Sequence, residues 1–526
     1  MKGLFCLVLH AHLPWVREPA HPRFLEESWL FEAVAECYLP LTAMLERWWR
    51  DGLAARLTLS LSPTLAAMLS DPLLRGRCRE YLLSRIELAE REQQRARWSP
   101  AVRRLAGAYA AVYRERAARH EACGGGLAGV WRQMADRGQI EVIPCSATHA
   151  VLPLLLPDPC SLRAQLGVAR SEHRRHFGKD APGFWLPECA YDPALDPWLA
   201  EAGARWSIVE TCGLLGSRPA PAAGVHAPVF TPHGQALFGR DPLTAFQVWS
   251  RHGGYPGDPR YRDFFRDAGF DLESEYLRPY WPGPDHQGFT GMKYHAITGA
   301  GADKRPYDPD EAARAVDEHA AHFRSLRRRV LAAPGPPAAR PPVLVAPYDA
   351  ELFGHWWYEG IAFLDQAARG DAAGGGQWEW ITPTDYLRRH PDLQVVEPPA
   401  SSWGEGADFR TWRQPNNRWM LERALEAGRI LQGLVRSRPA PAGAERRALE
   451  LAAQELLLAQ ASDWPFMVHT NSNAGCGRQR AQSHLDRFDA LADRIERGMI
   501  DEPWLANLAA SDSLFPDVDL CYWRDE

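Results

Sequence analysis

The sequence predicts an α/β fold in which parallel strands alternate with helices. Several short apolar runs are continuous and do not alternate with polar residues, as expected where helices cover the outer face of a sheet. The runs predicted as buried strands are residues 4–10, 56–62, 140–145, 183–186, 206–209 and 343–347. Helical periodicity lies between them, at 30–49, 161–177 and 309–331. Such alternation over about 390 residues is typical of an α/β barrel or of an open doubly wound sheet.

Three segments depart from this alternation. Residues 78–134 are densely charged with helical periodicity, and we expect helices inserted after the second strand. Residues 213–305 are rich in Gly, Pro and aromatic residues, and we expect a region of long loops. After residue 400 the pattern becomes helical, over 416–436, 442–461 and 477–497. The sequence therefore predicts an α/β domain over residues 1–400 and a C-terminal helical domain over residues 401–526.

Composition excludes several classes of function. The chain has 526 residues, of which 46% are hydrophobic and 24% charged, with a formal net charge of -6. This mild negative charge disfavours a nucleic-acid partner, which requires a basic face. No apolar run reaches about 18 residues, so we expect no membrane span. The ten cysteines form no CxxC pair. They therefore indicate neither a zinc ribbon nor a redox motif, and we expect reduced thiols in a cytoplasmic protein.

Two carboxylates follow prolines at the ends of predicted strands. Glu188 comes after Pro187, and Asp349 comes two residues after Pro347. The carboxyl ends of parallel strands are where α/β folds build their sites. Paired carboxylates suit glycoside chemistry, in which one attacks the anomeric carbon and the other protonates the leaving oxygen. Either carboxylate taken alone could equally be a helix N-cap or an ion-pair partner.

Two histidines end the first predicted strand. His10 and His12 are alternate residues, so both can face one cavity. They could bind a metal, with His149 as a third ligand, or they could donate to sugar hydroxyls. No Asp accompanies the pair, and the nearby Trp15 suggests a sugar subsite, so we predict no metal. The 21 tryptophans are compatible with sugar platforms and equally with core packing.

A set of motifs resembles glycoside hydrolase family 57 in order and spacing, and within it the 1,4-α-glucan branching enzymes. The motifs are HAHLPW at 10–15, GQIEVIPCSATHAVLPLL at 138–155, WLPECAY at 185–191, APYDAELFGHWW at 346–357, SSWGEGADFRTW at 401–412 and ASDWPF at 461–466. The resemblance covers nearly the whole chain. It implies an incomplete (β/α)7 barrel with a helical insertion and a C-terminal helical domain. Strand and helix alternation alone does not distinguish this barrel from an open sheet.

The resemblance also assigns roles to residues. Glu188 matches the family's nucleophile and Asp349 its general acid/base. It further implies that His10, His12, Glu141 and His149 line the subsite around the cleaved bond, and that Trp403 and Trp412 guide glucan near the acceptor side. The remaining motif residues predicted to bind substrate are Trp185, Phe238, Arg240 and Asp241. No cofactor is implied.

The activity implied is retaining transfer on an α-1,4-glucan such as amylose or a glycogen-like polymer. Transfer to a 6-hydroxyl gives an α-1,6 branch, and transfer to a 4-hydroxyl gives disproportionation. Transfer to water gives hydrolysis. The two carboxyl groups should lie about 5–5.5 Å apart. The alternatives are a 4-α-glucanotransferase or an α-amylase of the same family, a glucan-binding protein with little activity, and a metal-dependent hydrolase of related topology.

One departure from the family concerns a loop after the nucleophile. The branching enzymes that the chain resembles carry a tyrosine at the tip of this loop, which shields the glycosyl intermediate from water. The equivalent stretch here, 226–249, contains no tyrosine, and its phenylalanines are Phe230, Phe238 and Phe246. We expect Phe238 to stand nearest to the missing tyrosine, and we therefore expect substantial hydrolysis beside branching.

Overall fold

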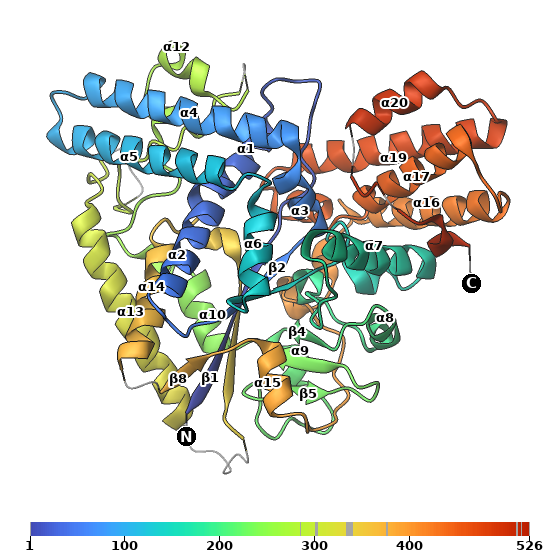
Figure 1. The fold of residues 1–526 in the computed structure, drawn as a ribbon, viewed down its shortest axis with the longest axis horizontal. Helices are drawn as coiled ribbons and strands as arrows, with labels where there is room; N and C mark the ends of the chain where they lie inside the picture. Colours follow the sequence, from blue (N-terminus) through green and yellow to red (C-terminus); the bar gives the residue numbers. More distant parts are fainter. Residues whose placement is uncertain are drawn as a thin grey trace.

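The computed structural model consists of a strand barrel surrounded by helices, with a helical hairpin on one side and a helical bundle on another (Figure 1). It describes residues 2–283, 286–299, 303–332, 340–374, 377–511, 514–516 and 518–524. No helix in these ranges is both long enough and apolar enough to cross a membrane.

The barrel is built from two sheets. The larger has the order β3-β2-β1-β7, and β8 also pairs with β1; all of these pairs are parallel. The smaller has the order β4-β6-β5, with β4 and β6 parallel. The strands are β1 (Gly3–Ala11), β2 (Leu57–Leu61), β3 (Ile140–Ile143), β4 (Trp206–Val209), β5 (Val229–Phe230), β6 (Ala236–Gly239), β7 (Val343–Asp349) and β8 (Trp378–Trp380).

Two links close the sheets into a ring. Residues 183–186 join β3 to β4 through isolated bridges, with Trp185 N donating to Pro144 O at 2.9 Å and Phe184 N to Trp206 O at 3.0 Å. On the other side, Asp241 N donates to Val345 O at 2.9 Å and joins the end of β6 to β7. The ring thus runs β1, β2, β3, 183–186, β4, β6, β7. No ladder connects β6 with β7 in the described chain, so the predicted incomplete (β/α)7 barrel is confirmed.

The predicted strand at 183–186 forms single bridges and no ladder. Prolines flank it at 182 and 187, and because proline has no N–H it cannot continue a ladder. This short, proline-bounded segment ends directly at Glu188.

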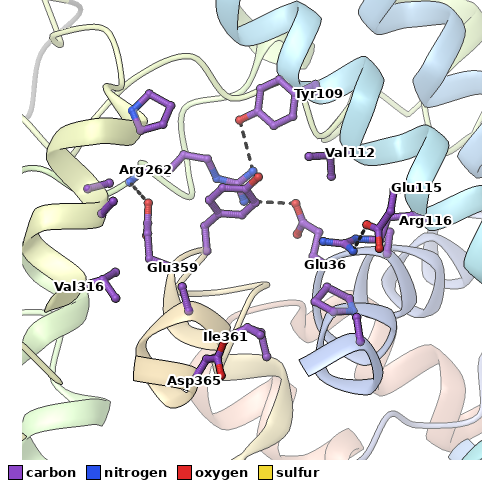
Figure 2. Close-up of a pocket in the computed structure, with 18 of the residues that line it drawn as sticks. Glu36, Tyr109, Val112, Glu115, Arg116, Arg262, Val316, Glu359, Ile361 and Asp365 are labelled. Atoms are coloured by element: carbon purple, nitrogen blue, oxygen red, sulfur yellow. Dashed lines mark hydrogen bonds and ion pairs between the residues drawn. The ribbon is translucent and has the colours of Figure 1, made fainter. Parts of the chain in front are cut away.

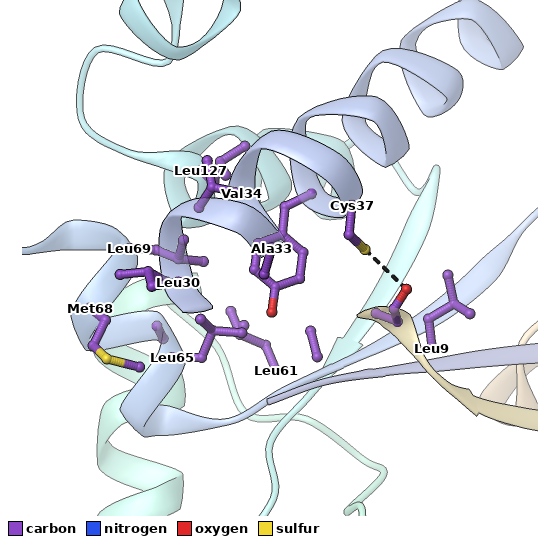
Figure 3. Packing of buried hydrophobic residues seen from close by; sticks show 14 of the residues in the cluster. Leu9, Leu30, Ala33, Val34, Cys37, Leu61, Leu65, Met68, Leu69 and Leu127 are labelled. Atoms are coloured by element: carbon purple, nitrogen blue, oxygen red, sulfur yellow. Dashed lines mark hydrogen bonds between the residues drawn. The ribbon is translucent and has the colours of Figure 1, made fainter. Parts of the chain in front are cut away.

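Helices pack on the outside of the barrel and bury its apolar residues. Figure 3 shows Leu9 of β1 and Leu61 of β2 beneath Leu30 and Val34. Cys37 Sγ donates to Ala350 O at 3.0 Å, which ties this layer to the turn after β7. The helices here are α1 (Leu25–Ala33), a π-helical turn (Val34–Tyr38), α2 (Leu39–Arg50), α7 (Pro159–Phe177), α8 (Asp196–Glu201), α13 (Pro309–Ala332), α14 (Gly360–Ala373) and α15 (Pro383–Arg389).

The helices predicted over 78–134 are present between β2 and β3. They are α4 (Pro72–Arg95), α5 (Pro100–Ala122) and α6 (Leu127–Asp136), and a further helix outside the predicted range, α3 (Pro63–Ser70), precedes them. The long pair α4 and α5 lies side by side at the edge of the molecule (Figure 1). Asp71 caps α4 by accepting from Leu74 N at 2.9 Å, and Pro72 occupies its first turn, a favourable start for a helix.

The expectation of long loops over 213–305 is wrong for 236–249. Residues 236–239 form the barrel strand β6, and residues 242–249 form α10 (Pro242–Trp249). A four-residue strand that ends in Gly239 and follows Gly234 carries too short a pattern to be distinguished from a loop. The rest of this region includes the end of α9 (Thr211–Leu215), the short strand β5, α11 (Ala268–Asp271) and α12 (Ser274–Leu277). Residues 284–285 and 300–302 lie outside the described chain.

The C-terminal part is helical, as predicted. Its helices are α16 (Arg418–Arg436), α17 (Gly443–Ala459), α18 (Asp463–Thr470), α19 (Ala474–Arg497) and α20 (Glu502–Ser511). The turn between α17 and α18 reaches back to the barrel, where Ser462 N donates to His149 O at 3.1 Å. The domain boundary after residue 400 stays a prediction.

Candidate active site

A pocket of about 620 Å³ opens at the carboxyl ends of the barrel strands. His10 of β1 is in register with Ser60 of β2 and with Asp349 of β7, so these side chains lie at one level of the rim. The pocket brings together most of the residues predicted from the sequence. Those that line it are His10, His12, His149, Glu188, Arg240, Asp349, Trp403 and Trp412.

The backbone at Glu188 is left-handed, with φ 62° and ψ 20°, and Cys189 follows with φ 48°. Non-glycine residues adopt this region at a cost in free energy, and they persist there when surrounding contacts hold them. Those contacts come from Ser401–Trp403: Trp403 N donates to Glu188 O at 2.9 Å, and Tyr191 and Ser401 exchange backbone bonds at 2.8 and 2.9 Å. The segment after residue 400 therefore fixes the position of Glu188.

Two side chains donate to the Glu188 carboxylate. Trp403 Nε1 donates to Oε2 at 2.7 Å, and Ser462 Oγ donates to Oε1 at 3.0 Å. Burial raises the pKa of Glu188 above its ordinary value, whereas these two donors act in the opposite direction. Hydrogen bonds to a carboxylate stabilise its charged form. They also hold its oxygens in fixed positions, which suits a nucleophile.

A chain of hydrogen bonds continues from Ser462 into the barrel. When Ser462 donates to ionised Glu188, its oxygen accepts from His149 Nδ1 at 2.8 Å. His149 Nε2 then carries a lone pair and accepts from His10 Nε2 at 2.8 Å, and His10 Nδ1 accepts from Ser60 Oγ at 3.0 Å. Burial lowers the pKa of both His10 and His149 well below the ordinary value. This lowering favours neutral rings, and an ionised Glu188 then selects the tautomers in which each ring donates once and accepts once along the chain.

Asp349 lies in a different electrostatic environment. Burial raises the pKa of Asp349 well above its ordinary value, the charges of Glu351 and Glu188 raise it further, and Arg240 opposes them. Glu351 itself accepts from the Tyr38 hydroxyl and from His12 N. The charge of an ionised Glu188 thus favours a protonated Asp349, and this difference is the division of roles that an acid and a nucleophile need.

His12, His149 and Asp463 lie close enough to one another to hold a metal ion. Their ligand atoms are, however, engaged in hydrogen bonds. His12 Nε2 contacts Asp463 at 3.1 Å and its Nδ1 contacts Ser62 at 2.9 Å, while His149 uses both ring nitrogens in the chain described above. A metal ion would have to break these bonds, so the arrangement fits a hydrogen-bond network better than a metal site. The absence of a metal stays a prediction.

Aromatic side chains form part of the pocket wall. Trp249 and Trp403 meet edge to face at 6.0 Å, and the Arg240 guanidinium lies 5.8 and 5.5 Å from their ring centres. Arg240 is anchored by Glu210 at 3.0 Å. Trp412 is buried beneath Gly404, so it supports the wall. A Cβ at Gly404 would lie 2.8 Å from the Trp412 ring, which shows how closely the backbone approaches it.

Four predicted residues do not line the pocket: Glu141, Trp185, Phe238 and Asp241. Trp185 lies behind the site, stacked on His10 at 4.6 Å, and it contacts Trp403 at 5.3 Å. Asp241 caps α10 by accepting from Thr244 N at 2.7 Å. It is therefore a helix cap, and the expectation that it lines the substrate site is corrected.

Glu141 points into the opposite end of the barrel. Ile143 pairs with Ser60 and so lies at the level of His10, and Glu141 comes two residues earlier in β3. Its carboxylate accepts from Thr58 Oγ1 at 3.0 Å. Burial raises the pKa of Glu141 to about 7. The expectation that it lines the subsite around the cleaved bond is wrong, because that position of β3 lies nearer the amino end of the strands.

Phe238 is a core residue of β6. It is fully buried, with its ring 5.8 Å from Trp206 and 5.9 Å from Tyr386. It cannot shield an intermediate at the barrel mouth, so the expectation that it replaces the loop tyrosine is wrong. Among the described residues that line the pocket there is no tyrosine.

Residues that sequence reasoning missed are Ser462 and Asp463, at the start of α18. Both contact predicted site residues, Ser462 through Glu188 and Asp463 through His12. They belong to the motif ASDWPF, which was available as a signal. Their distance along the chain and their place in a helical segment gave no physical reason to bring them to the barrel.

A second cavity, of about 650 Å³, lies among α2, α5, α13 and α14 (Figure 2). Its buried Arg262 is paired with Glu36 at 3.2 Å and with Tyr109 at 3.4 Å, and Arg116 pairs with Glu115. This cavity contains none of the predicted site residues. Its charged groups join the inserted hairpin to the barrel.

Comparison with known proteins gives matches along most of the chain. The model of glycosyl hydrolase family 57 matches residues 6–399, and the model of the C-terminal domain of 1,4-alpha-glucan branching enzymes matches residues 424–523. A 1,4-alpha-glucan branching enzyme of Thermococcus kodakarensis is 32% identical over 98% of this chain and 78% of its own. A probable 1,4-alpha-glucan branching enzyme of Mycobacterium tuberculosis is 31% identical over 95% of this chain and 94% of its own.

Solved structures agree with this fold. The alpha-amylase AmyC of Thermotoga maritima superimposes with a TM-score of 0.92 at 34% identity, covering 100% of both chains. The family 57 branching enzyme of Pyrococcus horikoshii has a TM-score of 0.90 at 30% identity, covering 100% of this chain and 97% of its own. With a family model over three quarters of its residues and relatives of this similarity, the chain belongs to glycosyl hydrolase family 57.

Proposed function

We propose that this protein is a retaining 1,4-α-glucan branching enzyme. The observation that carries the proposal is the pair Glu188 and Asp349 at the barrel mouth, whose surroundings favour different protonation states. The branching enzymes among its relatives and the matched C-terminal domain support this activity. The proposed substrate is an α-1,4-glucan in glycogen biosynthesis. The ten free thiols suit a cytoplasmic location.

The chemistry follows from the two carboxyl groups. Glu188 attacks C1 of an α-1,4-linked glucose while Asp349 gives its proton to the leaving 4-oxygen, which yields a covalent glycosyl-enzyme. Asp349, now ionised, removes the proton of an acceptor hydroxyl, and that oxygen displaces Glu188 from C1. A 6-hydroxyl as acceptor creates an α-1,6 branch.

Hydrolysis is the second candidate outcome at the same site. It is favoured by the absence of tyrosine among the described pocket residues and by the high structural similarity to the alpha-amylase AmyC of Thermotoga maritima. Water competes with a sugar hydroxyl for the same intermediate, and a difference of about 1.4 kcal/mol between the two barriers changes their ratio tenfold. We therefore propose branching accompanied by hydrolysis.

Incubation with amylose tests the proposal. Proton NMR measures new α-1,6 linkages, and a reducing-sugar assay on the same sample measures hydrolysis. New α-1,6 signals support a branching enzyme. New reducing ends without α-1,6 signals indicate an amylase, altered chain lengths without either indicate a 4-α-glucanotransferase, and an unchanged polymer contradicts all three.

Ser462→Ala removes one of the two donors to the nucleophile. Hydrogen bonds to charged groups contribute about 1.5–3 kcal/mol, so we expect kcat to fall roughly 10- to 100-fold with a small change in KM. Because the donor lowers the pKa of Glu188, the acid limb of the pH profile should move to higher pH in Ser462→Ala.

Ser462→Thr should restore much of the activity. Ser437→Ala, which removes a hydroxyl bonded to Leu434 O, is the matched control. An unchanged pH profile in Ser462→Ala would contradict this role.

The pH dependence of kcat/KM should be bell-shaped. Activity needs ionised Glu188 and protonated Asp349, so it is lost below the lower apparent pKa and above the higher one. Because burial raises both pKa values, both limbs should lie at higher pH than ordinary carboxyl groups would give. Initial rates on amylose between pH 4 and about pH 10 measure this. A profile without an alkaline limb would contradict the role of Asp349 as acid.

A further inference from the structure

Five aromatic side chains form a continuous surface strip beside the catalytic pocket. Phe264 is the centre of this aromatic strip, with its ring 4.5 Å from Trp356, 5.2 Å from Phe265 and 5.3 Å from Phe289. Phe289 in turn lies 5.2 Å from Phe270. Each step is comparable with the length of one glucose ring. The five rings therefore make one connected surface.

Three of the five rings of the strip are exposed to solvent, whereas Phe264 and Phe289 are half-buried. The exposed fractions are 61% for Phe265, 53% for Trp356 and 48% for Phe270. Large apolar side chains gathered on a surface commonly mark a binding site, whereas single exposed ones are ordinary. Other exposed aromatic residues, such as Trp98 on the inserted hairpin, lie outside this strip. Hydrophobic collapse alone would have buried these rings.

Buried charges hold the strip in place. The ammonium of Lys293 lies 4.5 Å from the Phe264 ring centre and 3.9 Å from that of Phe289, and it donates to Phe264 O at 2.5 Å. Lys293 is paired with the carboxylate of Asp267 at 3.5 Å. That carboxylate also accepts four hydrogen bonds of 2.6–3.0 Å, from Thr290 N, Thr290 Oγ1, Gly291 N and Gly269 N. A rigid support lowers the entropic cost of binding.

The strip continues the catalytic pocket. Trp356 belongs to both, since it lines the pocket and packs against Phe264. At the outer end, the Arg251 guanidinium lies 5.7 Å from the Phe265 ring centre and supplies a polar donor. A polymer that leaves the pocket past Trp356 would meet the exposed rings of Trp356, Phe265 and Phe270, with the Arg251 guanidinium beside Phe265.

We propose that the aromatic strip binds an α-1,4-glucan chain beyond the catalytic pocket, and thereby favours long chains over short ones. The proposal rests on the proposed function. Its physical basis is that the C–H faces of glucose rings pack on aromatic rings while their hydroxyls point outward to water and to groups such as Arg251. The path from Trp356 through Phe264 and Phe289 to Phe270 has three steps of 4.5, 5.3 and 5.2 Å, which gives this surface the length for about three glucose units.

The test is the double variant Phe265→Ser, Phe270→Ser, which leaves the pocket residues intact. We expect KM for amylose to rise about tenfold, equivalent to about 1.4 kcal/mol. The value of kcat/KM for a maltosyl fluoride, which is too short to reach the strip, should stay within twofold. Phe265→Tyr, Phe270→Tyr keeps the rings and should retain the wild-type KM. Trp98→Ser, at a residue 70% exposed, is the control for loss of a surface aromatic ring.

Electrophoretic retardation in gels containing glycogen separates failure of the strip from failure of the proposed function. If the Ser double variant is no longer retarded while wild type and Trp98→Ser still are, the strip binds glucan. This result supports the proposal even for an enzyme that does not form branches. Equal retardation of all three proteins, or an equal rise of KM on both substrates, overturns the proposal. Gel filtration of wild type and double variant adds a further outcome: a dimer that only the wild type forms would show that the strip binds a second copy of the chain instead.

Discussion

Glu188→Gln is expected to abolish turnover on amylose while glucan binding stays within a few-fold of wild type. An amide cannot form the covalent glycosyl intermediate, so no alternative route through the same position remains. The side chain keeps its size and its oxygen, which can still accept from Ser462 or Trp403. Reducing-end and α-1,6 assays measure turnover, and retardation in glycogen gels measures binding.

Glu141→Gln is the matched control for this prediction. Glu141 lies at the other end of the barrel, and because burial raises its pKa to about 7 the amide resembles its neutral form. It should keep near-wild-type activity. Residual activity above a few per cent in Glu188→Gln, in a preparation free of contaminating amylase, would show that another group is the nucleophile.

Asp349→Asn is expected to lose activity on amylose by several orders of magnitude and to recover substantially on a maltosyl fluoride. Fluoride leaves without a proton, so the first step no longer needs the acid, whereas the second still lacks its base. Burst kinetics on the fluoride should therefore show rapid release of fluoride followed by a slow steady state. Equal losses on both substrates would assign Asp349 a structural role.

The same substitution has an expected effect on stability. Burial and the charges of Glu351 and Glu188 raise the pKa of Asp349, so the folded state binds its proton more tightly than the unfolded state. The free energy of unfolding is then largest below the unfolded pKa of about 4 and falls as pH rises toward the folded pKa. Asn cannot ionise. The variant should melt at a higher temperature than wild type at neutral pH and at a similar temperature near pH 3.5 or below.

The strands that the sequence predicted are those with long, continuous apolar runs, such as β1 and β7. The strand β6 was missed because four residues beside glycines carry little periodic information. Closure of the ring depends on three backbone bonds, at Phe184, Trp185 and Asp241, which no side-chain pattern encodes. The barrel therefore had to come from resemblance, since alternation alone left an open sheet possible.

For the site, the position of a residue along its strand was a better guide than its residue type. Glu188 and Asp349 could be placed because they end strands, and strand ends meet at one rim. Glu141 and Phe238 come from similar motifs, yet both lie inside strands, where depth along the barrel and side-chain direction decide what they contact. Ser462 could not be placed at all, because its contact with Glu188 spans 274 residues of sequence.

The place of β1 has a consequence for how the chain is made. β1 is synthesised before the other strands of the barrel, and it pairs with β2 on one side but with β7 and β8 on the other. Its second edge therefore waits for residues 343–380 to be synthesised. Unpaired apolar strands are prone to pair with other chains, and long-range parallel pairing forms slowly. Any nascent chain or proteolytic fragment that ends before Val343 has one edge of β1 unpaired and able to pair with other chains. We therefore expect the protein to depend on chaperones more during its synthesis than after its release.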